Sequence, residues 1–218
     1  MSISNLFVEI LLPGLIDTLY MVILSTLFAV IIGFIPAIVL VITDEKGLKP
    51  NKTVNRSLDF VINLLRSFPF IILMIAIIPF TRLLVGTSIG RNAAIVPLTI
   101  GAAPFAARVI ESALKEVDPG IIEAAKSFGA STSQIIFKVM LKEALPSIVL
   151  GITLTVISVI GYSAMAGTIG AGGLGDIAVR YGYQRFKTDI MIYTIIILII
   201  IVQVLQSLGN YAYKKLSK

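Results

Sequence analysis

The feature that most constrains the fold of this chain is a set of long apolar stretches without charge. Residues 18–43 and 190–211 contain no Asp, Glu, Lys or Arg. Each is long enough to cross the hydrocarbon core of a bilayer, which takes roughly 20 apolar residues. Only 14% of the 218 residues are charged, whereas soluble domains have about 25%. Residues 1–218 are therefore predicted to form one all-α integral membrane domain.

Five membrane spans are predicted, at residues 18–43, 60–80, 93–110, 147–167 and 190–211. The apolar residues 3–16 are interrupted by Pro13-Gly14 and are expected to be an interfacial lead-in. Gly33 and the alanine-rich third span favour close packing between membrane helices. No basic segment or small-residue cleavage site precedes the first apolar run, so a cleaved signal peptide is not expected.

The basic residues predict the orientation of the spans. With five spans, 13 of the 18 Lys and Arg residues lie in the loops or near the span ends of one side, and 5 lie on the other side. Since basic loops remain in the cytoplasm, the N-terminus is predicted to face outward and the C-terminus inward. The same distribution explains the net charge of +6 without a nucleic-acid partner. The residues on the basic side are Lys46, Lys49, Lys52, Arg56, Arg66, Arg108, Lys115, Lys126, Lys138, Lys142, Lys214, Lys215 and Lys218, and those on the other side are Arg82, Arg91, Arg180, Arg185 and Lys187.

A polar segment, residues 115–146, lies between the third and fourth spans and is predicted to be cytoplasmic. Asp118-Pro119 is typical of a helix start, and Gly129 of a left-handed helix end. Ser131 and Gln134 form a capping-box pattern that begins a second helix. The segment is therefore predicted to be two short helices joined by a glycine corner.

The first of these helices contains Glu123, Ala124 and Ala125. Two alanines keep it thin enough to enter a groove of another protein, and Glu123 adds a charge that can form an ion pair. A helix that only packs on its own membrane domain is an equally good interpretation. A DNA-binding helix-turn-helix is not, because the segment is a short insert between spans without a soluble core of its own.

Glu123-Ala124-Ala125, followed after three residues by Gly129, resembles the EAA signature of ABC-importer permeases, which docks onto a cytoplasmic ATPase. The family usually has Leu-Pro about a dozen residues after the glycine. This chain has Leu141-Lys142 there and Leu145-Pro146 one turn later.

The resemblance extends to the methionine-importing ABC permeases through residues 63–70, 94–107, 161–167, 170–175 and 181–183. It implies a type I importer-permease fold in a bacterial inner membrane and a homodimer with the transport path on its axis. The implied partners are two cytoplasmic ATPase subunits, which bind ATP and Mg, and an external methionine-binding protein. No catalytic residue, metal or cofactor is expected in this chain.

Residues 170–175 fit G-x-G-x-x-G, with Gly170, Gly172, Gly173 and Gly175. A dinucleotide site also requires a preceding strand and a following helix, and here a membrane span precedes the motif. A glycine-rich outer turn that contacts a second copy or an external partner is the better interpretation. The chain also lacks G-x-x-x-x-G-K-[ST], so it is not expected to hydrolyse ATP.

Residues 161–167 place Tyr162, Ser163 and Met165 near the outer end of the fourth span. These side chains could line a translocation path, and Met165 from two copies could form a hydrophobic gate. Ordinary helix packing explains the same residues equally well. Arg66 and Asp17 are expected near span ends, where Arg66 extends to the cytoplasmic interface.

Two other classes of function remain open. An ion-coupled carrier would use carboxylates buried in its spans, and only Asp17 and Glu111 come near to that. A membrane-embedded enzyme would lack the commonest acid–base group and nucleophile, because the chain has no His and no Cys. Within the ABC permeases, another amino acid, a betaine or a phosphonate remains an alternative solute.

Overall fold

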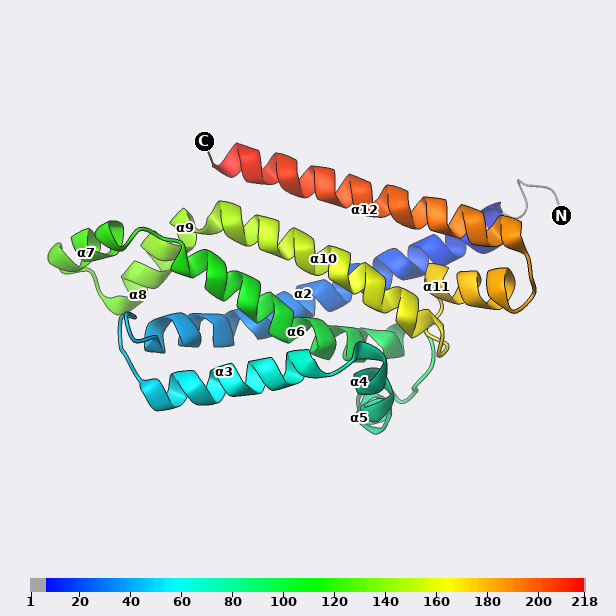
Figure 1. Cartoon of the computed structure of the whole chain (residues 1–218), viewed down its shortest axis with the longest axis horizontal. Coiled ribbons are helices and arrows are strands. Elements are labelled where there is room, and N and C mark those ends of the chain that lie inside the picture. Colours follow the sequence, from blue (N-terminus) through cyan, green and yellow to red (C-terminus); the bar gives the residue numbers. More distant parts are fainter. Residues whose placement is uncertain (1–6, 218) are drawn as a thin grey trace.

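The computed structural model describes residues 7–217, and every regular element within them is helical (Figure 1). Four helices are long and apolar enough to cross a membrane, and a bent helix pair supplies a fifth crossing if it is counted as one span. In chain order the elements are η1 (Phe7–Leu11), α2 (Leu12–Thr43), α3 (Lys52–Ser67), α4 (Phe70–Ala76), α5 (Ile78–Val85), α6 (Arg91–Lys115), α7 (Pro119–Ser127), α8 (Thr132–Gln134), η2 (Ile135–Met140), α9 (Leu141–Glu143), α10 (Leu145–Gly167), α11 (Gly173–Ile177), η3 (Ala178–Tyr183) and α12 (Thr188–Leu216).

The first long helix begins earlier than the sequence predicts. Pro13 is the second residue of α2, next to the junction with η1, and it interrupts neither element. Helix α2 therefore continues through Pro13-Gly14, and η1 extends it by another turn. Residues 7–16 are continuous with the first span, so the expected interruption at Pro13-Gly14 is wrong, and residues 3–6 lie outside the described part.

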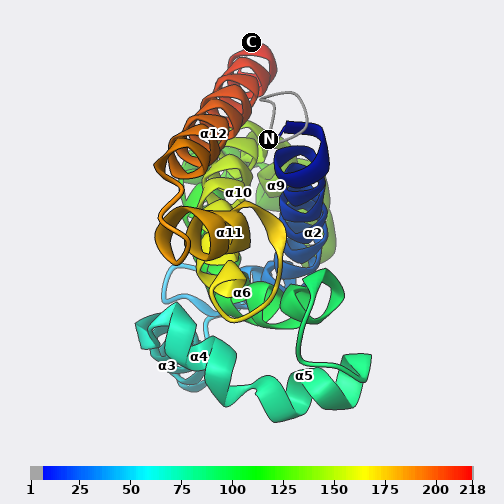
Figure 2. The same cartoon turned by 90° about the vertical axis from the view of Figure 1, so that its right-hand side faces the viewer.

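The second predicted span, residues 60–80, is not one straight helix. Helix α3 ends at Ser67, and α4 follows at an angle of 98°. Phe68 has an extended backbone, as expected for a residue that precedes proline, and Pro69 cannot donate the hydrogen bond that would continue α3. Helices α4 and α5 consequently lie along one side of the bundle, next to α6 (Figure 2).

Helix α6 is the centre of the bundle, packing against α2, α3, α4 and α10. Its alanines are buried, as the third span predicted; they include Ala94, Ala102, Ala103, Ala106 and Ala107. On α2, Gly33 faces this alanine surface so closely that an added Cβ would lie 2.7 Å from the carbonyl oxygen of Ala103. The absence of a side chain at residue 33 therefore sets the distance between α2 and α6.

The charged loops gather at two opposite ends of the bundle. The end of α2 and the segment from α7 to α9 lie together on the left of Figure 1, whereas α11 and the start of α12 lie on the right. The predicted grouping of basic residues follows this division, apart from Lys218, which is outside the described residues. Arg66 differs because it occupies the last turn of α3, one helix length away from the basic loop at residues 44–51.

We predict that Gly33→Ala destabilises the folded chain by about 1–3 kcal/mol, because the new methyl group overpacks the backbone of α6. A lower midpoint of thermal unfolding in detergent would show this. The matched control is Ile35→Ala on the same helix, since Ile35 is 68% exposed. Equal midpoints for the two variants would contradict the close contact.

Candidate functional site

The segment between α6 and α10 begins with the helix that the sequence predicts. Asp118 caps α7, its Oδ1 accepting a hydrogen bond from the Gly120 N–H at 2.7 Å. Pro119 is the first residue of α7, where proline fits without loss of a hydrogen bond. The helix ends at Ser127, and Gly129 follows with φ of +77°, a conformation that glycine adopts without a Cβ clash.

The second helical stretch begins at the predicted capping box. The Gln134 N–H donates to Ser131 Oγ at 3.3 Å, and the Ser131 N–H donates to Gln134 Oε1 at 2.8 Å. The chain then continues through η2 and α9 to α10, whose first turn contains Pro146. Pro146, which lies one turn after the position where the family usually has its Leu-Pro, is therefore part of the start of α10.

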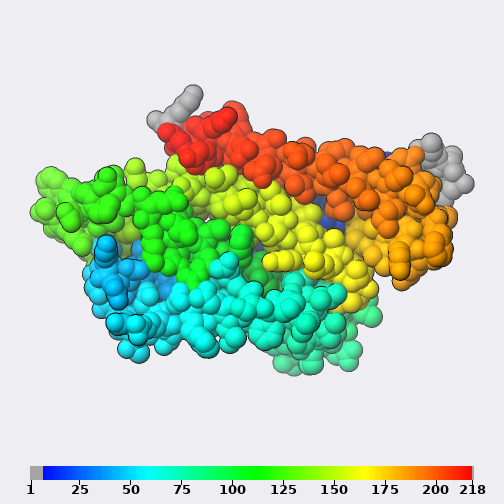
Figure 3. Space-filling view, viewed as in Figure 1, coloured from blue at the N-terminus to red at the C-terminus, as the bar shows by residue number. Residues whose placement is uncertain are grey.

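The surface of the glycine corner is exposed at the end of the molecule, where α7 and α8 project in Figure 3. Glu123 and Ala124 are exposed, whereas Ala125 is half-buried against the bundle. The most exposed large side chain here is Phe128, with 91% of its surface accessible. The sequence prediction did not single out Phe128, because its exposure depends on the tertiary structure.

The second stretch is fixed to the bundle by its apolar side chains. Ile135, Ile136 and Met140 are buried in the same core as Ala37 of α2 and Leu114 of α6. A displacement of this segment must therefore move the ends of α2 and α6, because close-packed interiors transmit strain.

A network of ion pairs links α2, α3 and α6 near this end. Arg108 pairs with Asp59 of α3 and, at 2.8 Å, with Glu111. Lys115 lies 2.9 Å from Glu111 and 2.8 Å from Asp44, at the end of α2. Glu111 is buried, and both of its oxygens have cationic partners, as a buried carboxylate requires.

Asp44 also faces a cavity behind α7. The hydrogen bond from the Lys115 ammonium, together with one from the Lys46 N–H, holds the pKa of the Asp44 carboxyl below its usual range. The cavity has a volume of about 500 Å³ and is lined by both signs of charge, including Lys126 and Glu123 of α7. Helix α7 thus has open space between itself and the ends of α2 and α6.

The three candidate path residues of α10 face different directions. Tyr162 is half-buried and stacks on Phe70 of α4, with ring centroids 4.5 Å apart. Ser163 is buried, and its hydroxyl donates to the Ile160 carbonyl at 2.8 Å. Met165 is 47% exposed on the outer surface of α10, near the exposed Gly161. The structure therefore leaves Met165 available to a neighbouring molecule and turns Ser163 inward.

The glycine-rich turn after α10 packs against its own bundle. Gly170, Gly172 and Gly173 all have positive φ, and an added Cβ at Gly175 would lie 2.4 Å from the Ala164 carbonyl oxygen. The Leu174 N–H donates to Thr18 Oγ1 of α2 at 2.8 Å. Gly173 and Gly175 are buried, so they shape the turn from within.

The exposed side chains of this outer end lie a few residues further on. Tyr183 and Phe186 are 70% and 87% exposed. Phe186 has φ of +54°, which is uncommon for a residue with a side chain and marks a tight turn before α12. Asp17, predicted at a span end, lies at the same end of the bundle and pairs with Arg91 at 2.7 Å.

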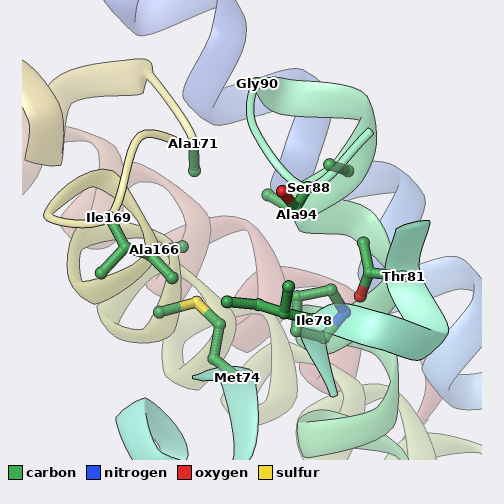
Figure 4. Close-up of a pocket in the computed structure, with 11 residues that line it drawn as sticks. Met74, Ile78, Thr81, Ser88, Gly90, Ala94, Ala166, Ile169 and Ala171 are labelled. Atoms are coloured by element: carbon green, nitrogen blue, oxygen red, sulfur yellow. The ribbon is translucent and has the colours of Figure 1, made fainter. Parts of the chain in front are cut away.

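A small cavity near the outer ends of α6 and α10 is shown in Figure 4. Met74, Ile78 and Ala166 are among the residues that surround it, and Thr81 points toward it. Its volume of about 20 Å³ has room for about one water molecule. It is therefore too small to hold a solute.

Comparison with known proteins gives a consistent result. Residues 29–218 match the family described as "Binding-protein-dependent transport system inner membrane component". The chain is 52% identical over 202 residues to the probable D-methionine transport system permease protein MetI of Vibrio cholerae, covering 93% of this chain and 90% of that protein. It is 49% identical over 171 residues to the methionine import system permease protein MetP of Bacillus subtilis, covering 78% and 77%.

The three-dimensional fold is similar to that of a chain in a crystal structure of the MetNI methionine ABC transporter, which shows inward-facing conformations. The two chains are 43% identical, and the match covers 100% of each with a TM-score of 0.96.

Proposed function

This chain belongs to the family of binding-protein-dependent transport system inner membrane components, and we propose that it is the permease subunit of an ATP-driven importer of methionine. The observation that carries the proposal is the match along the whole chain to the MetNI methionine ABC transporter, at 43% identity and a TM-score of 0.96. The expected all-α type I importer-permease fold is confirmed by the same match. The chain is a multi-pass protein of the inner membrane.

We further propose that the active transporter contains two copies of this chain, two cytoplasmic ATPase subunits and an external methionine-binding protein. ATP and Mg are bound by the ATPase subunits. The N-terminal end faces outward, and the corner between α7 and α8 faces the cytoplasm, as the distribution of Lys and Arg favours.

The corner at Gly129 is the surface that docks onto the ATPase. Glu123 and Ala124 present a thin, exposed helix face, and Phe128 supplies a large apolar side chain of the kind that anchors protein interfaces. Because Ile135 and Met140 are packed against α2 and α6, closure of the ATPase dimer pulls on the ends of both long helices. The open space behind α7 allows that displacement.

Met165 forms the gate, together with Met165 of a second copy. Its exposed thioether lies beside Gly161, where an added Cβ would have no neighbour within 4 Å. A second copy can therefore approach α10 closely at this level, and two flexible apolar side chains can close a narrow path. Tyr162 borders the path, and Ser163 supports it from inside α10. The external binding protein docks around the turn shaped by Gly170, Gly172, Gly173 and Gly175, on exposed side chains such as Tyr183 and Phe186.

An ion-coupled carrier is the less favoured function. Of the two carboxylates that the sequence offered for it, Asp17 pairs with Arg91 and Glu111 pairs with Arg108 and Lys115. A carboxylate that already has cationic partners is poorly suited to bind and release a transported ion.

The function is tested by uptake of labelled methionine in cells that lack this chain, with and without its restoration. Uptake should disappear and return, and it should fail on ATP depletion but persist when ion gradients are dissipated. If methionine uptake is unaffected while uptake of another amino acid, a betaine or a phosphonate falls, the permease assignment holds and the substrate is wrong.

We predict that Phe128→Ala weakens docking of the ATPase by about 2 kcal/mol, roughly 30-fold in affinity, because an exposed aromatic anchor is lost. Titration of purified ATPase onto the permease in detergent measures this. Phe60→Ala is the matched control, since Phe60 is 66% exposed on α3, away from the corner. Unchanged affinity for Phe128→Ala would exclude Phe128 from the interface.

We predict that Met165→Ala opens a leak, because the smaller side chains no longer meet across the path. The measurement is passive efflux of labelled methionine from vesicles that contain the transporter without ATP. Leu154→Ala, another exposed position on α10, is the control. A seal as tight as that of the wild type would remove Met165 from the gate.

A further inference from the structure

Arg66 lies far from the end of the membrane domain at which the sequence placed it. Helix α3 begins at Lys52, and Arg66 follows fourteen residues later in its last turn. At 1.5 Å per residue, this is about 21 Å from the start of the helix. Arg66 is therefore separated from the charged residues at the start of α3 by almost the full length of that helix.

Arg66 borders a cavity of about 190 Å³ at the junction of α3, α4, α6 and α10. The junction lies in the middle of the bundle, since Gly101, on its α6 side, is near the midpoint of that 25-residue helix. Besides Arg66, the walls are mainly aromatic; they include Phe68, Phe70, Phe105 and Tyr162.

The aromatic wall is held in place by close packing. Gly101 has no side chain, and an added Cβ there would lie 2.9 Å from the ring of Phe70. The Phe70 ring therefore lies against the backbone of α6, and its other neighbour is Tyr162, stacked at 4.5 Å with an angle of 12° between the planes. Arg66, in the last turn of α3, and Phe70, the first residue of α4, both line the cavity at the bend between the two helices.

Arg66 has no hydrogen-bond or ion-pair partner among the described residues, which is also true of Arg56 and Arg185, but of these three only Arg66 lines the cavity. Arg91, Arg108 and Arg180 each form an ion pair with a carboxylate. Among the hydrogen bonds and ion pairs within residues 7–217, none involves the side chain of Arg66. An unpaired cation at membrane depth is costly unless it serves a ligand, and its planar guanidinium fits a carboxylate with two parallel hydrogen bonds.

We propose that this cavity is a transmembrane subsite for the amino acid in transit, a proposal that rests on the proposed function. Arg66 binds the α-carboxylate of the solute. The aromatic rings of Phe68, Phe105 and Tyr162 surround an apolar side chain, and a thioether makes favourable sulfur contacts with such rings. The subsite thereby selects amino acids with apolar side chains within the membrane, after release from the external binding protein.

Binding is tested first without transport. The chain contains no tryptophan, so Phe68→Trp adds a fluorescent reporter to the wall of the cavity. In the detergent-solubilised complex with the ATPase, L-methionine should change the fluorescence in a saturable way, and L-methionine amide, which lacks the carboxylate, should not. The response should be lost when Arg66→Gln is added and retained with Arg56→Gln, an exposed arginine on the same helix. No response, or an equal response with Arg66→Gln, overturns the subsite.

A transport measurement then tests the subsite separately from the proposed permease function. In vesicles with the complete transporter, Arg66→Gln should lower methionine uptake about tenfold, the loss expected for one charge-assisted hydrogen-bonded contact, while ATP hydrolysis continues. Arg66→Lys should recover part of the uptake, and Arg56→Gln should match the wild type. Wild-type uptake by Arg66→Gln refutes the subsite and leaves the permease function intact. Absence of methionine uptake by the wild type refutes the methionine assignment, and the fluorescence assay still decides whether the cavity binds an amino acid.

Discussion

The structure depends on the close approach of α2 and α6, which is possible because Gly33 presents no side chain to Ala103 and Ala107. In a membrane, helices gain little from hiding apolar surface from lipid, so association relies on backbone proximity and dense van der Waals contact. The pair provides the surface on which α3, α4 and α10 pack. It also extends to the inner end of the bundle, where the loop segment adds Ile135 to the same core as Ala37 and Leu114.

Most buried polar groups of this bundle have a partner nearby; the exceptions among the described residues are Thr26 Oγ1, Thr81 Oγ1 and Arg108 Nε. The hydroxyls of Thr18, Thr155 and Thr194 each donate to the carbonyl four residues earlier in their own helix. Glu111 is satisfied by cations on its own helix, and Arg108 of this group reaches Asp59 on α3. Because these polar groups already bond within the bundle, few polar side chains are left that could interact with a solute. Arg66 differs from these groups because it lines a cavity and has no hydrogen-bond or ion-pair partner in the described chain.

Local signals in the sequence predicted local structure well. The cap at Asp118, the left-handed Gly129 and the capping box of Ser131 depend on side chains within a few residues, so the sequence alone identifies them. The bend after Ser67 was missed because an apolar stretch of suitable length predicts a straight span, and proline position alone does not distinguish a break from a tolerated kink. Pro36, which α2 accommodates, illustrates the difference.

The exposure of Phe128 and the surroundings of Arg66 could be learned only from the tertiary structure. The sequence around Phe128 and Arg66 does not indicate which surfaces the rest of the chain leaves uncovered. Phe128 is notable because no other element packs against it, and Arg66 because it borders a cavity. The bend between α3 and α4, which was not predicted from the sequence, creates the surroundings of Arg66. By turning α4 out of line with α3, it brings Phe70 to Gly101 and Tyr162 and leaves the last turn of α3 beside an open cavity. Because Arg108 ties Asp59 of this same helix to α6, any movement of α6 driven from the inner end also shifts the helix that carries Arg66. A cavity bounded by helices that move together with the docking loop is therefore placed to change its affinity for a solute during the transport cycle.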